Sequence, residues 1–256
     1  NIGSNLDSDY GSKFDNITIA IDLLIMEKLK VKNISNFYET PSYPNRKLPK
    51  FLNIGIKVEY NGNYQMLIKK IKLQILKLKR EGFEVSSLDL GGGVGIKYND
   101  KNKILDIKTY AQVIDELFSD LNLEIIIEPG RYLVGSSGII LSRVIRTKEG
   151  DNKDFVIIDA GMDNLIRPAL YGAEHKIIPV KKKKQINLKS YDIVGPICET
   201  SDVFIKKMKI HRLNSDDLVV ICSTGAYSSC MASQYNLRKP AKEIFIKKKK
   251  FILSNN

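Results

Sequence analysis

Two short segments, each directly after an apolar run, carry residues that could bind a charged ligand. Gly91, Gly92 and Gly93 follow the run that ends at Leu90. Successive glycines let the backbone approach a ligand with its N–H groups, as in phosphate-binding loops, and a tight turn is the alternative. The second segment, Glu128-Pro129-Gly130-Arg131, places a carboxylate and a guanidinium after another apolar run. Ligands bind at such positions in parallel sheets, and a structural ion pair is the alternative.

Three later segments also carry reactive or charged side chains. Arg167 and Tyr171 stand four residues apart, and an arginine can bind a carboxylate through two parallel hydrogen bonds. Cys198 precedes Glu199, which places a thiol beside a carboxylate, although a lone cysteine is often an inert buried thiol. Tyr227 follows the sequence CSTGA. Taken singly, each of these segments favours a structural role over a chemical one.

The elements expected to position the first two segments alternate between helix and strand. The apolar spacing predicts helices over Tyr64–Arg80, which Gly82 ends, and over Tyr110–Leu121. Asp15 is expected to cap a further helix near the N-terminus, and residues 33–49 are expected to form a loop. Buried strands are predicted at Val85–Leu90 and Glu124–Ile127. This alternation is typical of an α/β fold with parallel strands.

Helical periodicity is absent after about Ser136, and the sequence predicts a second, all-β part. The expected strands are Ile139–Thr147, Phe155–Asp159, Ile186–Val194, Leu218–Ser223 and Ile244–Phe251. We therefore predict an α/β domain over residues 1–135 and a β domain over residues 136–256.

Composition narrows the possible partners. Of the 256 residues, 43% are hydrophobic and 27% are charged, which is typical of a globular protein. The formal net charge is +12, but the lysine runs Lys181–Lys184 and Lys247–Lys250 lack the interleaved aromatic residues of nucleic-acid-binding motifs. We interpret these runs as solvated surface and expect no nucleic-acid partner.

Membranes and metals are also not expected. No apolar run approaches the ~18 residues of a membrane helix, and the polar N-terminal segment is unlike a secretory signal. Three cysteines without metal-like spacing predict free thiols in a reducing compartment, so we expect a cytoplasmic location. Two histidines leave little scope for a histidine-based metal site.

Five segments, in this order, together resemble one enzyme family. LDLGGGVGI, IIIEPGRYLVG, IDAGMDNLIRPALYGAEHKI, DIVGPICETSD and CSTGAYSSCMASQYNLR are similar to segments of diaminopimelate decarboxylases, and the resemblance covers roughly residues 50–245. These are pyridoxal-phosphate enzymes of the alanine-racemase-like fold. Ornithine- and arginine-type decarboxylases share the glycine and EPGR segments, whereas RPALYGAEH and ICET resemble the diaminopimelate branch. The resemblance implies the C-terminal part of a pyridoxal-phosphate-binding (β/α)8 barrel, followed by a β-barrel or Greek-key domain.

The resemblance also implies roles for individual residues. The cofactor would be bound by Gly91, Gly92, Gly93, Glu128, Gly130, Arg131 and Tyr227, with Glu128 at the pyridine nitrogen. The substrate would be bound by Arg131, Arg167, Tyr171, Glu199 and Tyr227. Cys198 would return a proton to the carbon that loses CO2. The implied reaction converts meso-diaminopimelate to L-lysine and CO2 in a homodimer, with Cys198 and Glu199 reaching the partner's site.

The N-terminal part departs from the family pattern. The family's Schiff-base lysine lies in a segment like YAxKAN, and nothing here matches it, because Lys57 stands too close to Gly91. Asn53 and Ile56 replace the histidine and serine of the family's HIGS segment. We therefore expect a chain that begins midway round the barrel and is inactive alone. It would be a fragment or one piece of a two-piece enzyme; the alternative is a non-catalytic homologue that associates with a full-length decarboxylase.

Overall fold

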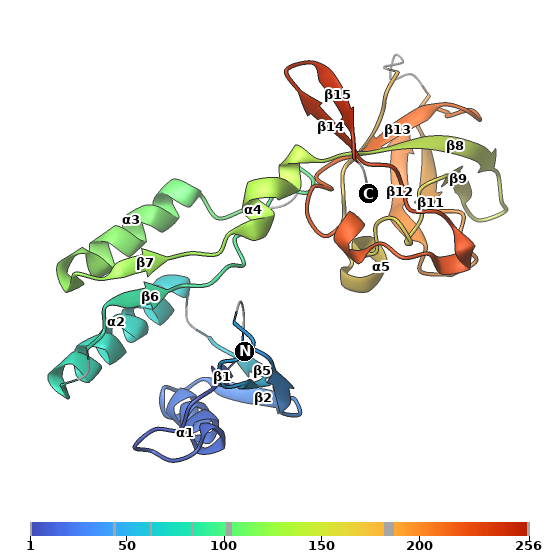
Figure 1. Ribbon diagram of the computed structural model, residues 1–256. Helices are drawn as coiled ribbons and strands as arrows, with labels where there is room; N and C mark the ends of the chain where they lie inside the picture. Colours follow the sequence, from blue (N-terminus) through green and yellow to red (C-terminus); the bar gives the residue numbers. More distant parts are fainter. Residues whose placement is uncertain are drawn as a thin grey trace. The chain divides into compact units, whose positions relative to one another are not determined.

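The computed structural model describes residues 2–42, 45–61, 63–82, 84–100, 104–181 and 187–254 (Figure 1). The chain forms two compact units, residues 1–81 and residues 82–256, and each is described by itself. The domain boundary predicted at residues 135 and 136 stays a prediction.

The first unit contains two helices and short antiparallel strands. A three-stranded sheet has the order β1 (Ile2–Ser4), β4 (Phe51–Ile54), β3 (Tyr38–Thr40), and β2 (Lys30–Ile34) pairs with β5 (Ile56–Glu59). The prediction of a loop over residues 33–49 was wrong, because β3 and the end of β2 lie within it. Tyr38, Glu39 and Thr40 pair with β4, the next strand along the chain, so strand pairing and not a local sequence pattern determines this structure.

The helices of this unit begin and end at recognisable sequence signals. Helix α1 (Lys13–Met26) is capped by Ser12, whose hydroxyl oxygen accepts a hydrogen bond from the backbone N–H of Asp15. Asp15 is therefore not the capping residue; its carboxylate accepts from the backbone N–H of Ser12 at 2.8 Å and completes a capping box. Helix α2 (Tyr64–Arg80) confirms the predicted bounds, and Gly82 follows it with a left-handed φ of +93°.

The second unit begins with the predicted parallel strands. β6 (Ser87–Asp89) pairs in parallel with β7 (Glu124–Ile126), and α3 (Ile107–Phe118) lies between them in the chain. All three elements confirm the predicted types, with shorter strands than expected. Helix α3 begins one turn before the predicted start, because Asp106 accepts a hydrogen bond from the backbone N–H of Thr109 at 2.9 Å. The short helix α4 (Gly130–Val134) follows β7 and was not predicted.

The second unit also contains a six-stranded sheet. Its order is β10 (Ile177–Pro179), β13 (Leu218–Ile221), β8 (Ile140–Lys148), β9 (Asp154–Ile158), β11 (Lys189–Val194), β12 (Val203–Ile210). Only β9 and β11 pair in parallel among its neighbours. The predicted strands are confirmed at β8, β9, β11 and β13. Ile186, the predicted start of the third strand, lies outside the described residues.

Sequence periodicity missed two strands and one helix of this part. β12 pairs with β11 in an irregular register, and Lys207 within the strand has a left-handed φ of 54°. β10 has only three residues, and α5 (Arg167–Tyr171) has only five. Such short elements carry too few residues for a periodic signal.

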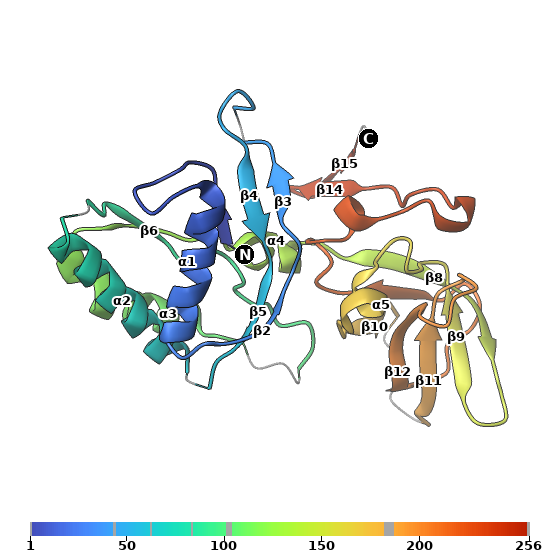
Figure 2. The same ribbon diagram turned by 90° about the horizontal axis from the view of Figure 1, so that it is seen from below.

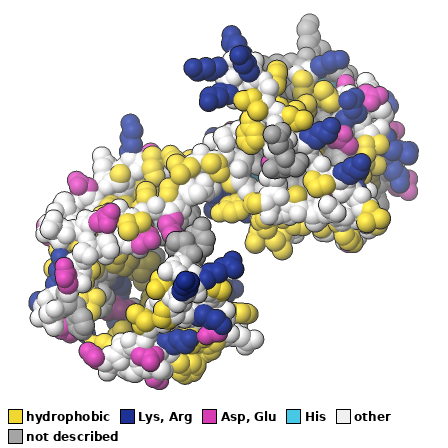
Figure 3. Space-filling model, in the orientation of Figure 1, with side chains coloured by type: hydrophobic (Ala, Val, Ile, Leu, Met, Phe, Trp, Pro, Cys, Tyr) yellow, Lys and Arg dark blue, Asp and Glu magenta, His cyan; other side chains and the backbone are white. Residues whose placement is uncertain are grey.

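The second lysine run, Lys247–Lys250, spans the turn of a hairpin and does not lie within a single strand. β14 (Ile244–Lys247) and β15 (Lys250–Leu253) make a hairpin, and Lys248 and Lys249 both have left-handed φ values. The single strand expected over Ile244–Phe251 was therefore wrong, because the chain reverses at a two-residue turn. Figure 2 shows this hairpin apart from the six-stranded sheet, and Figure 3 shows basic side chains at its tip. Of the first run, Lys181 is exposed, and Lys182–Lys184 lie outside the described residues.

Within the described ranges, no helix has the length and apolar character required to span a membrane.

Candidate functional site

The glycine segment and Glu128 lie side by side because β6 and β7 are parallel neighbours. The backbone N–H of Glu128 donates to the carbonyl oxygen of Gly91 at 2.8 Å, and Asp89 accepts from the N–H of Gly91 at 2.7 Å. A Cβ on Gly92 would lie 2.5 Å from the carbonyl oxygen of Glu128. The two segments therefore pack so closely that only glycine fits at position 92.

This pair of segments fits a phosphate-bearing cofactor. Gly91 and Gly93 have left-handed φ values of +67° and +84°, and no atom beyond the adjacent residues lies within 4 Å of a Cβ built at either residue. Open space beside a glycine backbone lets a ligand approach the main chain. Glu128 is exposed at the end of β7, and Gly130 and Arg131 begin α4 directly after it.

Arg167 lies between two of the tyrosines that the sequence singled out. Its guanidinium carbon lies 5.0 Å from the ring centroid of Tyr171 and 5.0 Å from that of Tyr227. Its buried Nε has no hydrogen-bond partner. Tyr171 and Tyr227 are 61% and 42% exposed. The structure therefore brings three predicted substrate residues together, and two of them, Tyr171 and Tyr227, are exposed.

The loop that carries Tyr227 is packed against the end of α4. The backbone N–H of Gly225 donates to the carbonyl oxygen of Gly135 at 3.0 Å, and that of Thr224 donates to Gly138 at 2.9 Å. A Cβ on Gly225 would collide with the carbonyl oxygen of Val134. This contact connects the Tyr227 loop with the helix that begins at Gly130 and Arg131.

His175 connects the segment after the glycine loop to the sheet. Its ring packs edge-on against Tyr98 with 4.5 Å between the ring centroids. Its Nδ1 lies 2.9 Å from the carbonyl oxygen of Cys222, and its Nε2 is buried without a partner. Burial lowers the pKa of His175 below its usual value of 6.5, so the imidazole is neutral at pH 7. Sequence reasoning did not assign His175 a role, and only its place in the RPALYGAEH segment could have indicated one.

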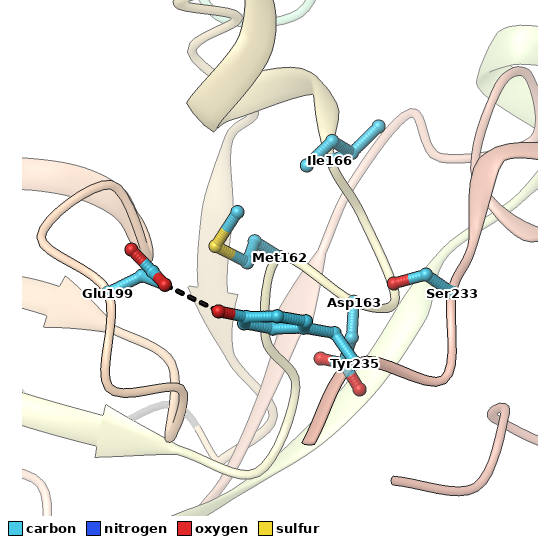
Figure 4. A pocket seen from close by; sticks show the side chains of 6 residues that line it. All are labelled: Met162, Asp163, Ile166, Glu199, Ser233 and Tyr235. Atoms are coloured by element: carbon cyan, nitrogen blue, oxygen red, sulfur yellow. Dashed lines mark hydrogen bonds between the residues drawn. The ribbon is translucent and has the colours of Figure 1, made fainter. Parts of the chain in front are cut away.

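Glu199 lines a pocket, and Cys198 precedes it on the exposed turn after β11. The pocket has a volume of about 270 Å³ and is lined by Met162, Asp163, Ile166, Glu199, Ser233 and Tyr235 (Figure 4). The hydroxyl of Tyr235 donates to Glu199 Oε1 at 2.6 Å. Asn236 Nδ2 lies 3.6 Å from Cys198 Sγ. Sequence reasoning missed Tyr235 and Asn236, although both stand in the last segment of the family resemblance.

Buried carboxylates fix the walls of this pocket. Asp163 accepts from Arg238 Nε at 2.9 Å, and its side chain is fully buried. Asp202 accepts from the backbone N–H groups of Met162 and Ile197 at 2.8 and 2.7 Å. Burial raises the pKa of Asp202 above its usual value. These contacts tie the segments at residues 162–163, 197–202 and 238 to one another.

The predicted site residues thus form three groups. The first contains Gly91, Gly92, Gly93, Glu128, Gly130 and Arg131; the second Arg167, Tyr171 and Tyr227; and the third Cys198 and Glu199. Among the residues the structure describes, no hydrogen bond joins Cys198 or Glu199 to the second group. The site roles of all these residues stay predictions.

In the first unit, the structure shows which residues surround the three positions that the family comparison singled out. Lys57 is an exposed residue of β5 and faces Asn33 in the β2–β5 pair. Asn53 Nδ2 donates to Thr40 Oγ1 at 2.8 Å. Ile56 begins β5, opposite Ile34. In the described part of the chain, no three His, Cys, Asp or Glu residues gather as a metal site would require.

Comparison with known proteins identifies one family. Residues 19–225 match the family model described as "Pyridoxal-dependent decarboxylase, C-terminal sheet domain". The diaminopimelate decarboxylase of Zymomonas mobilis is 36% identical over 83% of this chain and 51% of its own length. That of Neisseria meningitidis serogroup B is 45% identical over 70% of this chain and 42% of its own length. The chain spans about half the length of the curated relatives it matches.

Solved structures agree with the sequence comparison. Diaminopimelate decarboxylase from Helicobacter pylori, complexed with L-lysine, matches with a TM-score of 0.66 and 37% identity over 72% of this chain and 45% of that one. The M. jannaschii enzyme, in co-complex with L-lysine, matches with a TM-score of 0.68 and 35% identity over 72% of this chain and 43% of that one. These matches confirm the resemblance and the fold class expected from the sequence.

Proposed function

The chain belongs to the pyridoxal-dependent decarboxylases of the ornithine, diaminopimelate and arginine type, and from that membership we propose that it supplies the C-terminal half of a diaminopimelate decarboxylase active site. The completed site would convert meso-diaminopimelate to L-lysine and CO2. The lysine that binds the cofactor covalently would come from sequence beyond these 256 residues.

The observation that carries this proposal is the position of Arg167 between Tyr171 and Tyr227. A guanidinium held over two rings at 5.0 Å can bind a carboxylate with two hydrogen bonds through its terminal nitrogens. Diaminopimelate carries a carboxylate and an amine at both ends, so its distal end needs such a cation. The exposed Glu199 carboxylate has the charge required to bind the distal amine.

The first group of residues suits pyridoxal phosphate. Gly91, Gly92 and Gly93 would hold its phosphate together with the backbone at Gly130 and Arg131, and the Glu128 carboxylate would pair with the ring nitrogen. When bound, the cofactor supplies an electron sink for the pair left behind as CO2 departs. Arg167, Tyr171 and Tyr227 would orient the substrate, and the Cys198 thiol would donate a proton to the carbon that lost CO2.

A second copy would complete the site. Cys198, Glu199 and Tyr171 are exposed in the isolated chain, whereas decarboxylation requires a site shielded from water. We propose a homodimer in which Cys198 and Glu199 of each copy face the substrate residues of the other. The three free thiols support a cytoplasmic location for this assembly.

A second candidate function is a non-catalytic partner of a full-length decarboxylase. The specific observation in its favour is Asn53, which stands where the family has a histidine that stacks on the cofactor ring. The side-chain amide of Asn53 instead donates a hydrogen bond to the hydroxyl of Thr40.

Complementation separates these two functions. We expect the chain, mixed with the N-terminal half of a full-length diaminopimelate decarboxylase, to release CO2 from carboxyl-labelled meso-diaminopimelate and to form L-lysine in equal amount. Arg167→Met should abolish this activity. Arg143→Met is the matched control, because Arg143 makes an exposed ion pair with Asp216. If the mixture releases no CO2 and the chain alters the activity of an intact decarboxylase, the non-catalytic function replaces the proposed one.

A further inference from the structure

We propose that Tyr235 and Asn236 are positioning residues that hold the Glu199 carboxylate and the Cys198 thiol in place for the reaction. The proposal rests on the function proposed above. It assigns a role to two neighbouring residues of a 3₁₀ turn, Tyr235–Leu237, through their contacts with two neighbouring residues of a different turn.

The pairing is residue by residue. Tyr235 donates its hydroxyl hydrogen to Glu199 Oε1 at 2.6 Å (Figure 4). Asn236 donates from Nδ2 to Cys198 Sγ at 3.6 Å, within hydrogen-bond distance for sulfur. Both contacts join segments far apart in the sequence. The turn that carries Tyr235 and Asn236 therefore contacts both the Glu199 carboxylate and the Cys198 thiol.

The backbone of the donor turn has an unusual conformation at the central residue. Asn236 has φ 56° and ψ 28°, the left-handed region that asparagine tolerates better than most residues. This conformation lets two successive side chains both reach the Cys198–Glu199 turn. An asparagine at position 236 thus serves the backbone as well as the sulfur contact.

The donor turn is anchored at both ends to residues around Asp163. The backbone N–H of Ser233 donates to the carbonyl oxygen of Asp163 at 2.9 Å. On the other side, Arg238 Nε contacts the Asp163 carboxylate at 2.9 Å, and Arg238 also donates to the carbonyl oxygen of Asp159. Hydrogen bonds to Asp163, one to its backbone and one to its carboxylate, therefore hold the chain on both sides of the Tyr235–Asn236 pair.

The acceptor turn is anchored to the same region. Asp202 accepts from the backbone N–H of Ile197, directly before Cys198, and from that of Met162, directly before Asp163. Hydrogen bonds thus connect both turns to residues 162–163. Such a doubly anchored pair of turns pre-organises the side chains between them.

The chemistry of each contact suits its acceptor. A phenol donating to Glu199 fixes the direction of the carboxylate while leaving its second oxygen for an ammonium group. The hydrogen bond to the Glu199 carboxylate raises the pKa of Tyr235, so the phenol stays protonated and remains a donor. The amide N–H that Asn236 donates holds the Cys198 sulfur in one position, which the proposed proton transfer requires.

The test measures alkylation of Cys198 in the whole chain, without cofactor or substrate. Iodoacetamide reacts with the thiolate, and peptide mass spectrometry gives a separate rate for each cysteine. Asn236→Asp keeps the shape of the side chain but places a carboxylate beside the sulfur, which disfavours the thiolate. We expect the Cys198 rate at pH 7 to fall roughly tenfold. The rate at exposed Cys230 should not change.

A matched variant controls for the added charge. Asn152→Asp makes the same substitution at an exposed position and should leave the Cys198 rate as in the wild type. An unchanged Cys198 rate in Asn236→Asp would overturn the proposal. So would an equal fall at Cys198 and Cys230, which would indicate a general structural change.

In the complemented enzyme the two positions should separate kinetically. Tyr235→Phe keeps the ring and removes the donor, so it should raise KM for diaminopimelate about tenfold with kcat nearly unchanged, because it acts through Glu199. Asn236→Asp should lower kcat with KM nearly unchanged, because it acts through Cys198. Equal changes in both parameters for both variants would contradict the proposal. A mixture that releases no CO2 would contradict the proposed function, while the alkylation rates would still decide the contact between Asn236 and Cys198.

Discussion

Replacing Cys198 with alanine is expected to lower the rate of L-lysine formation by the complemented enzyme about 10²- to 10⁴-fold, which is the usual contribution of a general acid. Cys198 is an exposed thiol on the turn after β11, beside the carboxylate proposed to bind the distal amine. Without it, the proposed proton donor to the carbon that loses CO2 is missing. Steady-state kcat for L-lysine release measures this effect.

Cofactor binding is the control for this prediction. The residues proposed to hold the phosphate and ring nitrogen of pyridoxal phosphate follow β6 and β7, and in the described part of the chain no hydrogen bond joins them to Cys198. Absorbance titration should therefore give the same affinity for the cofactor in Cys198→Ala and in the wild type. Cys230→Ala, at another exposed cysteine, should retain full activity. A Cys198→Ala enzyme with normal kcat would remove the thiol from the mechanism.

Replacing Arg238 with methionine is expected to destabilise the second unit by about 3–5 kcal/mol. Arg238 is the partner of the Asp163 carboxylate at 2.9 Å, and the Asp163 side chain is fully buried. Asp163 Oδ1 already lacks a hydrogen-bond partner, so loss of the guanidinium leaves a buried charge without compensation. Urea unfolding followed by a signal from the second unit measures the change.

Two further variants establish the cause of this loss. Asp163→Asn together with Arg238→Met removes both charges and should recover a substantial part of the stability. Arg143→Met breaks an ion pair whose Asp216 side chain is 81% exposed, and it should cost no more than about 1 kcal/mol. If Arg238→Met and Arg143→Met had equal effects, the Arg238–Asp163 pair would not hold the pocket together.

Local signals predicted the longer elements of this fold. The apolar stripe of α2 and the glycine after it gave the bounds of that helix, and apolar runs gave β8, β9 and β13. Signals of this kind lie within one element. The strand β3 and the bulged strand β12 depend on partners elsewhere in the chain, so no local pattern indicated them. The hairpin β14–β15 was missed because lysines occupy a turn that usually contains asparagine or glycine.

The sequence predicted only part of the candidate site, because some of its residues depend on contacts between distant segments. Arg167, Tyr171 and Tyr227 were selected through the family resemblance, and the structure places the guanidinium over both rings. Asp163 and Arg238 were missed because their role arises from an ion pair between distant segments. A buried charged pair of this kind leaves no periodic trace in a sequence.

We propose that this chain supplies the substrate residues of the site and that the cofactor-binding lysine lies elsewhere. Reduction with borohydride after addition of pyridoxal phosphate, followed by intact mass, tests it most directly. We expect no stoichiometric adduct on this chain alone. In the mixture with the N-terminal half, we expect one adduct per complex, on the N-terminal half. A stoichiometric adduct at a single lysine of this chain, such as Lys57, would show that the Schiff-base lysine lies in this chain.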